Sequence, residues 1–564
     1  MVNTYDSGGN LSTATDARGA VGTYSYDALN QVTQVAYSDQ TISFTYDAVT
    51  NGVGRLTGAS DANHTLAWTY DALGRVAGKG QTVGTITKSV GYAFTNGDLV
   101  TLVTPSGQTV TYGYTNHQIT SVVVNGTTIA GGVTYFPFGP VSGWTWGNAT
   151  TVSRTYDTDA NVTQISTAGD AINFGYDNAF RITGITDTGN SANTWTLGYD
   201  SLDRLTSAAE SGTTLGWTYD GNGNRLSQTG SNASTFTPST ASNQLNSVTG
   251  AITRTYGYDA AGNTTAYASD SFTLNQRGRV SVASLPGGTA DYIYNALGQM
   301  VQKSGNGGTT LLMYDEAGHL LGEYSSTGAL VEETVWMGDV PVATLQPNGS
   351  GISIYYVHSD QLNAPRVITR PSDNAIAWRW DTGPFGTVAP NQNPAGLGSF
   401  AYNLRVPGQY FLPESGLNLN YFRDYDPQTG RYLESDPIGL DGGINTYGYA
   451  LQNPLYFIDP SGLAKTTIEA AIEQALRRGD LGELQELLGA SVSDSETAAA
   501  RAAIKRLQTK AQDIISKECR GSINREFPNE LKENTLEEIF QLEKQGNPNA
   551  TKALKLLRSN EYKK

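Results

Sequence analysis

With 564 residues, the chain is too long for one ordinary hydrophobic core, so at least two domains are expected. Its formal net charge of −16 argues against nucleic acid or an anionic membrane as the partner of its acidic part. Cys519 is the single cysteine, which excludes an intrachain disulfide, and no apolar run reaches the length of a membrane span.

The first six residues, Met1 to Asp6, lack the basic and apolar regions of a signal peptide. If the protein is secreted or displayed at the cell surface, its export must therefore use another route. No cofactor or metal site is predicted from the residues that follow.

A Tyr-Asp pair recurs along the chain, with most neighbouring copies about 20 to 24 residues apart. The copies begin at Tyr5, Tyr26, Tyr46, Tyr70, Tyr156, Tyr176, Tyr199, Tyr219, Tyr258 and Tyr314, and Tyr294-Asn295 is a variant. Each copy predicts a strand, a tight turn and a second strand. A fixed period of this size indicates one hairpin unit stacked many times. The favoured role of each pair is structural: Asp caps the turn, and Tyr packs beside the next hairpin with its hydroxyl at a wet edge.

Two later segments are more specific than the repeats. The first is Tyr355-Tyr356-Val357-His358-Ser359-Asp360-Gln361-Leu362, and the second runs from about Asn403 to Ala464. Together with the Tyr-Asp array they resemble the Rhs family, which is similar to the C components of Tc toxins and, more distantly, to teneurins. The resemblance covers residues 1–464 and implies a mainly β fold, a hairpin ribbon wound into a hollow shell.

Asp-Pro-x-Gly-Leu occurs twice near the end of that region, at residues 436–440 and 459–463. The composition changes directly after the second copy. Residues 1–464 hold 19 of the 36 Lys and Arg and 36 of the 52 Asp and Glu, whereas residues 465–564 hold 17 and 16. We therefore expect three parts: a repeat shell at 1–402, an Rhs-associated core at 403–464, and a variable domain at 465–564.

The doubled motif can be interpreted in two ways. Asp-Pro-x-Gly is a common type I turn, but a return of the chain could also bring Asp436 and Asp459 together. Two close carboxylates share a proton, so one could activate water for attack on the Leu463-Ala464 bond while the other donates. Arg423 is the cation expected to separate their roles. The resemblance implies the same self-cleavage after the second motif. Two further residues, Arg431 and Asp426, are weaker candidates that we interpret as structural.

A sheet that encloses a folded domain of a hundred residues must cover a surface somewhat larger than that domain. The area that 464 residues can cover as strands is barely sufficient for this. The array also begins in mid-repeat. The expectation is that part of the shell comes from an upstream or second polypeptide, or that this chain is N-terminally incomplete.

Residues 465–564 predict a small, mainly α domain, with helices at about 466–488 and 493–517, from Thr535, and at 548–558. All four histidines, His64, His117, His319 and His358, precede it. Histidine-dependent nucleases and a Cys-His protease are therefore excluded for this domain. Its candidate site residues are Arg520, Arg525 and Glu526, for phosphodiester cleavage or sugar transfer, although the favoured explanation of these residues is solvated charges and a local salt bridge.

Two functions follow. In the first, the chain is a polymorphic toxin whose shell holds and releases a C-terminal effector, by family analogy a nuclease acting on competing bacteria. Its partners would be an immunity protein, an upstream shell or secretion module of type VI or similar kind, and a nucleic-acid substrate. In the second, it is a surface or adhesion protein with a C-terminal docking domain.

Overall fold

The computed structural model describes residues 2–136, 140–167, 170–210 and 212–463, and beyond these residues 528–536, 538, 539, 542, 547–550 and 552–554. The first two helices expected in the C-terminal domain lie outside the described residues, as do Arg520, Arg525 and Glu526. The capping box expected at Thr535 is present: the Thr535 amide donates to the Glu538 carboxylate, and the Glu538 amide donates to the Thr535 hydroxyl. Among the described residues, no helix has the length and apolar character needed to cross a bilayer.

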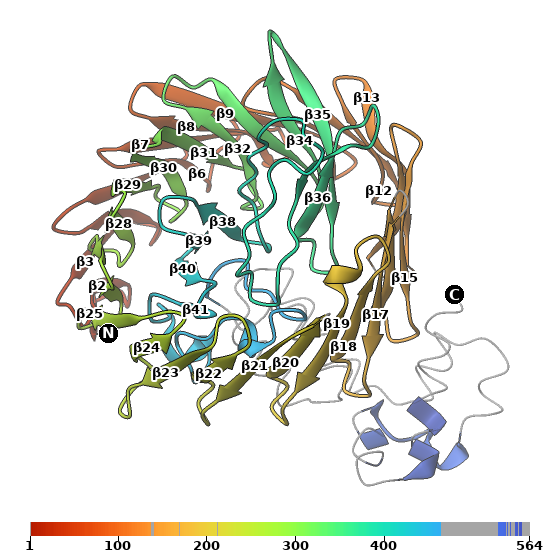
Figure 1. Ribbon diagram of the computed structural model, residues 1–564. Helices are drawn as coiled ribbons and strands as arrows, with labels where there is room; N and C mark the ends of the chain where they lie inside the picture. The colour runs from red at the N-terminus through yellow and green to blue at the C-terminus, as the bar shows by residue number, and fades with distance from the viewer. Residues whose placement is uncertain are drawn as a thin grey trace.

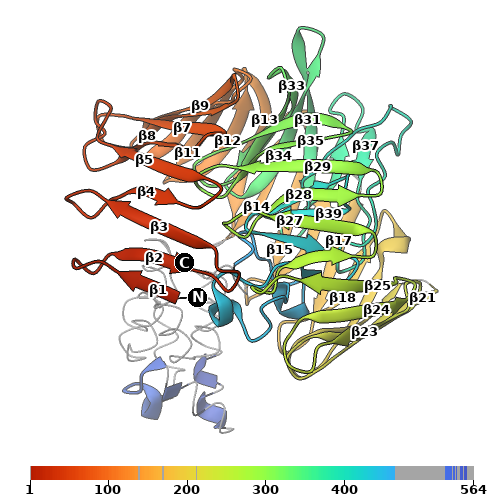
Figure 2. The same ribbon diagram turned by 90° about the vertical axis from the view of Figure 1, so that its left-hand side faces the viewer.

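One antiparallel sheet of 37 strands forms the body of the molecule, and each strand pairs with the next along the chain (Figures 1 and 2). Its first half comprises β1 (Val2–Tyr5), β2 (Leu11–Thr15), β3 (Val21–Tyr26), β4 (Val32–Ala36), β5 (Thr41–Tyr46), β6 (Leu56–Ser60), β7 (His64–Tyr70), β8 (Val76–Val83), β9 (Ile86–Thr95), β10 (Asp98–Val103), β11 (Thr109–Thr115), β12 (Gln118–Val124), β13 (Thr127–Tyr135), β14 (Val141–Trp146), β15 (Thr151–Tyr156), β16 (Val162–Thr167), β17 (Asp170–Tyr176) and β18 (Ile182–Asp187). After the 3-10 turn η1 (Ser191–Asn193) it continues with β19 (Trp195–Tyr199), β20 (Leu205–Glu210), β21 (Thr213–Tyr219), β22 (Arg225–Thr229), β23 (Ser234–Pro238), β24 (Leu245–Gly250), β25 (Arg254–Tyr258), β26 (Thr264–Tyr267), β27 (Asp270–Leu274), β28 (Val280–Leu285), β29 (Gly288–Tyr294), β30 (Met300–Gly305), β31 (Gly308–Tyr314), β32 (Leu320–Ser325), β33 (Leu330–Met337), β34 (Val340–Asn348), β35 (Gly351–Ser359), β36 (Pro365–Thr369) and β37 (Ile376–Arg379). The mainly β prediction is confirmed.

The Tyr-Asp turns have a common chemistry, which the copy at Tyr199 shows well. The Asp200 Oδ1 atom accepts the amides of Leu202 at 2.9 Å and Arg204 at 3.1 Å, and its Oδ2 atom accepts Arg204 Nε at 2.7 Å. The Arg204 guanidinium then donates to the carbonyl of Asp220 in the next turn, at 2.6 Å. This pair therefore closes its own turn, and the arginine four residues after its aspartate links that turn to the following one.

The tyrosine hydroxyls are hydrogen-bonded to the backbone, which the sequence did not indicate, and most of these tyrosines are only partly buried. They donate to a backbone carbonyl 13 to 17 residues earlier, at the start of a preceding strand. This bond is made by Tyr26, Tyr46, Tyr156, Tyr176, Tyr199, Tyr219, Tyr258 and Tyr294, at distances of 2.7 to 3.1 Å. The acceptor lies at the bulge of an earlier hairpin: Val32, which accepts the Tyr46 hydroxyl, is paired with Tyr26 beside the register shift between Ser25 and Tyr26.

We expect Asp200→Ala to open its turn while the strands remain paired. The amides of Leu202 and Arg204 lose their acceptor, so their hydrogen exchange should become roughly 5-fold faster or more, as for the loss of one hydrogen bond. Exchange followed by mass spectrometry on peptides spanning residues 199–205 measures this. Asp291→Ala removes an exposed carboxylate from the middle of β29 and is the control; equal acceleration in that variant would contradict the role of the turn.

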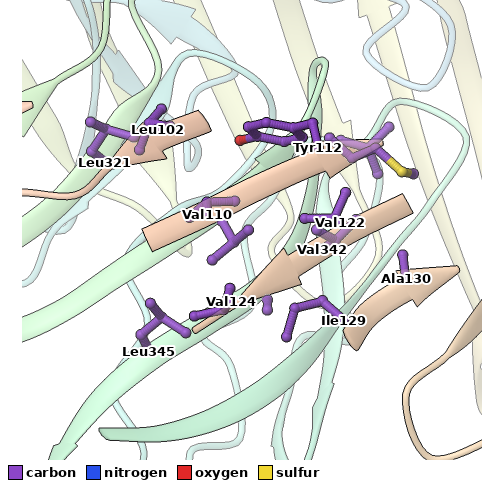
Figure 3. Packing of buried hydrophobic residues seen from close by; sticks show 14 of the residues in the cluster. Leu102, Val110, Tyr112, Val122, Val124, Ile129, Ala130, Leu321, Val342 and Leu345 are labelled. Carbon is purple, nitrogen blue, oxygen red and sulfur yellow. The ribbon is translucent and has the colours of Figure 1, made fainter. Parts of the chain in front are cut away.

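The ribbon winds around so that its later strands pack against its earlier ones (Figure 2). The Arg18 guanidinium donates to Asn275 O at 2.9 Å, and Arg154 Nη1 donates to Asn363 Oδ1 at 3.1 Å. The largest hydrophobic cluster lies between these layers, with Val110 and Val124 from the first and Val342 and Leu345 from the second (Figure 3). Burial of this apolar surface holds the wall together.

A second sheet of four short strands lies within the curve of the first (Figure 1). It consists of β38 (Gln409–Leu412), β39 (Leu417–Asn420), β40 (Arg423–Asp426) and β41 (Arg431–Tyr432), followed by the 3-10 turns η2 (Gly439–Gly442) and η3 (Ala450–Gln452). Several contacts join this inner sheet and the loop that follows it to the wall. The Arg254 guanidinium pairs with Asp426 at 2.6 Å, the Thr264 amide donates to Leu433 O at 3.0 Å, and the Tyr447 hydroxyl donates to Gly262 O at 2.6 Å.

Candidate active site

The two Asp-Pro-x-Gly-Leu motifs both form turns beside the inner sheet. In each turn the glycine amide donates to the aspartate carbonyl, at 2.9 Å for Gly439 and Asp436 and at 3.3 Å for Gly462 and Asp459. The aspartate side chains also accept amides of their own turns, from Ile438 at 3.0 Å and from Leu463 at 3.1 Å. Both motifs are therefore turns, and each presents an aspartate side chain beside the inner sheet.

Arg423, on β40, joins the two turns. Its Nη2 atom lies 2.8 Å from Asp436 Oδ2 and 3.2 Å from Asp459 Oδ2, so these oxygens are no more than about 6 Å apart. The exposed fractions of Arg423, Asp436 and Asp459 are 2%, 5% and 1%. A cation shared by two carboxylates away from water interacts strongly with both of them.

The rest of the guanidinium is also held in place. Its Nη1 atom donates to Thr446 O at 3.0 Å, and its Nε atom donates to the carbonyl of Gly462. The central carbon of the guanidinium, Cζ, lies 3.7 Å from the centre of the Tyr432 ring. The residue before Leu463 is thus bound by the arginine, while the Leu463 amide is bound by Asp459.

The two carboxyl groups have different surroundings. Burial raises the pKa of Asp436 to about 6, an effect that Arg423 and the Ile438 amide oppose and Asp459 reinforces. Asp436 therefore holds a proton below about pH 6 and loses it above. Asp459 receives, besides Arg423, the Tyr432 hydroxyl at 2.8 Å on Oδ2.

The structure brings together Arg423, Asp436, Asp459 and Leu463 from the residues that the sequence singled out. Ala464 lies outside the described residues. Arg431 and Asp426 are elsewhere: Arg431 donates to Asn243 O at 2.6 Å, and Asp426 pairs with Arg254. These contacts agree with the structural interpretation of both residues.

Three residues at the site were not identified from the sequence. Tyr432 and Asn420 are hydrogen-bonded to Asp459, and a Cβ atom on Gly442 would lie only 2.2 Å from Asp436 Oδ2. Gly442 thus leaves the space that the Asp436 carboxylate occupies. All three stand in the segment from about Asn403 to Ala464 that carries the resemblance, which is the one signal that could have pointed to them.

In the part of the chain that the structure describes, no group of three or more His, Cys, Asp and Glu could hold a metal ion. The site consists of two carboxyl groups, a guanidinium and a phenol around a turn of the chain's own backbone. Such a set can hold, donate and accept protons.

Fold and site together define a class of protein, a wound hairpin shell that encloses a small sheet with a carboxylate pair. The chain belongs to the teneurin YD-shell family, whose family model matches residues 171–454. The model for the RHS repeat matches residues 5–42.

Curated relatives agree with this membership. The chain is 39% identical over 111 residues to "Double-stranded DNA deaminase toxin A" of Burkholderia cenocepacia, a match that covers 20% of this chain and 8% of the relative. It is 30% identical over 197 residues to "Probable deoxyribonuclease RhsA" of Dickeya dadantii, covering 34% of this chain and 13% of the relative. The chain thus spans only a small part of the length of these proteins.

Among solved structures, the crystal structure of TcdB2-TccC3-TEV is similar to this chain with a TM-score of 0.70 and 18% sequence identity. The match covers 82% of this chain and 27% of that chain. At this identity the likeness concerns the fold, and it confirms the shell that the Tyr-Asp repeats predict.

Proposed function

We propose that this chain is a self-cleaving shell, which cuts the bond between Leu463 and Ala464 and thereby frees the domain that follows. The observation that supports it is a pair of hydrogen bonds: Arg423 donates to the Gly462 carbonyl, and the Leu463 amide donates to Asp459. The residues directly before the proposed scissile bond are thus already fixed by the site, so no separate substrate has to bind before hydrolysis.

The carboxyl groups suit the two proton transfers of peptide hydrolysis. Ionised Asp459 takes a proton from a water molecule as its oxygen attacks the Leu463 carbonyl carbon, and Asp436 gives its proton to the carbonyl oxygen. The carbon–nitrogen bond then breaks, and the Ala464 nitrogen receives the proton held by Asp459. As this bond breaks, one hydroxyl group of the tetrahedral intermediate returns a proton to Asp436. The products are a carboxylic acid at Leu463 and an amine at Ala464.

Intact-mass measurement of the purified chain tests the cut. Two species are expected, one ending at Leu463 and one beginning at Ala464, and they remain associated until denatured if the shell keeps the released domain. A single species of full length would contradict the proposal.

For residues 465–564 we propose a toxin that acts on competing bacteria and is neutralised in the producer by an immunity protein. The names of the relatives, a DNA deaminase toxin and a probable deoxyribonuclease, support a nucleic-acid substrate. Because this domain lacks histidine, phosphodiester cleavage would depend on residues such as Arg520, Arg525 and Glu526. Delivery would require an upstream shell and an export module of type VI or similar kind.

Expression of residues 465–564 in bacteria, with and without the product of the adjoining gene, tests the second part of the proposal. We expect growth arrest that the adjoining product relieves. The variant that combines Arg520→Ala, Arg525→Ala and Glu526→Ala should restore growth if these residues act on the substrate. Unimpaired growth in every host tried would favour the alternative, a surface or adhesion protein with a C-terminal docking domain.

A further inference from the structure

The two aspartates of the site receive unequal numbers of hydrogen bonds. Asp459 accepts the Tyr432 hydroxyl at 2.8 Å, the Leu463 amide at 3.1 Å and the Ser461 hydroxyl at 3.4 Å. Asp436 accepts the Ile438 amide at 3.0 Å. Donors that point at a carboxyl group stabilise negative charge on it, so the geometry distinguishes Asp459 from Asp436.

Tyr432 is held so that its proton can go only to Asp459. The Asn420 side chain donates from Nδ2 both to the Tyr432 oxygen, at 2.5 Å, and to the Asp459 carbonyl, at 2.9 Å. The carbonyl cannot donate, which fixes the amide orientation of Asn420. Because the phenol oxygen accepts from Asn420, its own hydrogen is directed toward the Asp459 carboxylate.

The tyrosine also remains a neutral donor. Burial and the nearby Asp459 charge raise the pKa of Tyr432 well above its ordinary value. Its ring lies against the Arg423 guanidinium, so one side chain contacts both the cation and one of the two carboxylates.

We infer that Tyr432, oriented by Asn420, is a positioning residue that keeps Asp459 ionised and so leaves the shared proton on Asp436. This inference rests on the proposed self-cleavage and assigns its two acids. Without the hydroxyl, the aspartates would be more nearly equivalent, and fewer molecules would hold the productive arrangement of protons.

Tyr432→Phe removes the hydroxyl and keeps the ring under Arg423. Tyr449→Phe is the matched control. Its ring centre lies 5.7 Å from that of Tyr432, and its buried hydroxyl has no hydrogen-bond partner in the described part of the chain. The chains are pulse-labelled in cell-free translation and diluted into buffers from pH 4 to 8, and the full-length fraction is followed with time on denaturing gels.

We expect Tyr432→Phe to cleave about 10- to 100-fold more slowly, as for a lost hydrogen bond to a charged group, and Tyr449→Phe to cleave at the wild-type rate. The pH profile is the decisive measurement. Asp459 should take up a proton more readily in Tyr432→Phe, which moves the acidic limb to higher pH. The basic limb, set by Asp436, should stay near pH 6.

A second variant guards against misfolding, with 3,5-difluorotyrosine at position 432 as a stronger donor of nearly the same shape. Its acidic limb should move to lower pH. Slower cleavage with unmoved limbs in Tyr432→Phe, or wild-type cleavage in both variants, would overturn the inference. If Asp436→Asn and Asp459→Asn block cleavage while Tyr432→Phe does not slow it, the inference alone fails. If those two variants cleave normally, both it and the proposed function fail.

Discussion

Asp436→Asn and Asp459→Asn, introduced singly, should each leave the chain as one full-length band on a denaturing gel, whereas the wild type gives two fragments. Asparagine keeps the shape of the side chain but neither holds nor takes up the transferred proton. General acid and base catalysis typically contribute about 10²- to 10⁴-fold, so we expect cleavage at Leu463 to slow by at least that factor in each variant.

The control for this pair is Asp441→Asn, in η2 of the same loop, where the carboxylate is exposed. It should cleave like the wild type, because it removes the same charge outside the site. The two aspartate variants should still show the β signature of the wall in circular dichroism. Fragments ending at Leu463 in both aspartate variants would rule out the mechanism.

Arg423→Gln should produce the second large effect, a loss of both cleavage and stability of the inner sheet. The substitution leaves two buried carboxylates without their shared cation and two backbone carbonyls, of Thr446 and Gly462, without a donor. Breaking a buried ion pair by removing one partner typically costs about 3–5 kcal/mol. Limited proteolysis within residues 420–463 and thermal denaturation would measure the change.

A matched variant separates stability from chemistry. Arg254→Gln breaks the ion pair to Asp426, which joins the inner sheet to the wall away from the site. It should also lower the stability of the fold, but the chain should still be cleaved after Leu463. Combining Arg423→Gln with Asp459→Asn removes the excess negative charge, so part of the stability should return without cleavage. Normal cleavage in Arg423→Gln would contradict the role of the cation.

The wall could be predicted from the sequence because its chemistry is local. An aspartate such as Asp200 bonds to amides two and four residues ahead, and a tyrosine such as Tyr199 bonds to a carbonyl 17 residues back. The contacts that form each copy therefore join residues that are close in the sequence. Contacts between the layers, by contrast, join residues more than 200 positions apart, such as Arg18 and Asn275. No periodic pattern indicates which hairpins meet at that separation.

The candidate site was predictable to the extent that its residues belong to a repeated motif. Asp436 and Asp459 stand at equivalent places of two copies, and Arg423 was chosen as the nearby cation, with which the resemblance agrees. Asn420 and Gly442 have no such mark, because an amide and a missing side chain acquire their roles only when β39 and η2 come to lie beside the two turns.

The contacts between the inner sheet and the wall also set an order of events. Gly262 and Thr264 of the wall bind Tyr447 and Leu433, and these wall residues are translated more than 150 positions earlier. A ribosome adds residues in sequence, and pairings of such long range form late because closing the intervening loop costs entropy. The turn that holds Asp459 is therefore expected to assemble late, on a wall that has already formed. If the proposed cleavage occurs there, it would depend on correct assembly, because a misassembled wall could not bring Asp436, Asp459 and Arg423 together and residues 465–564 would stay attached.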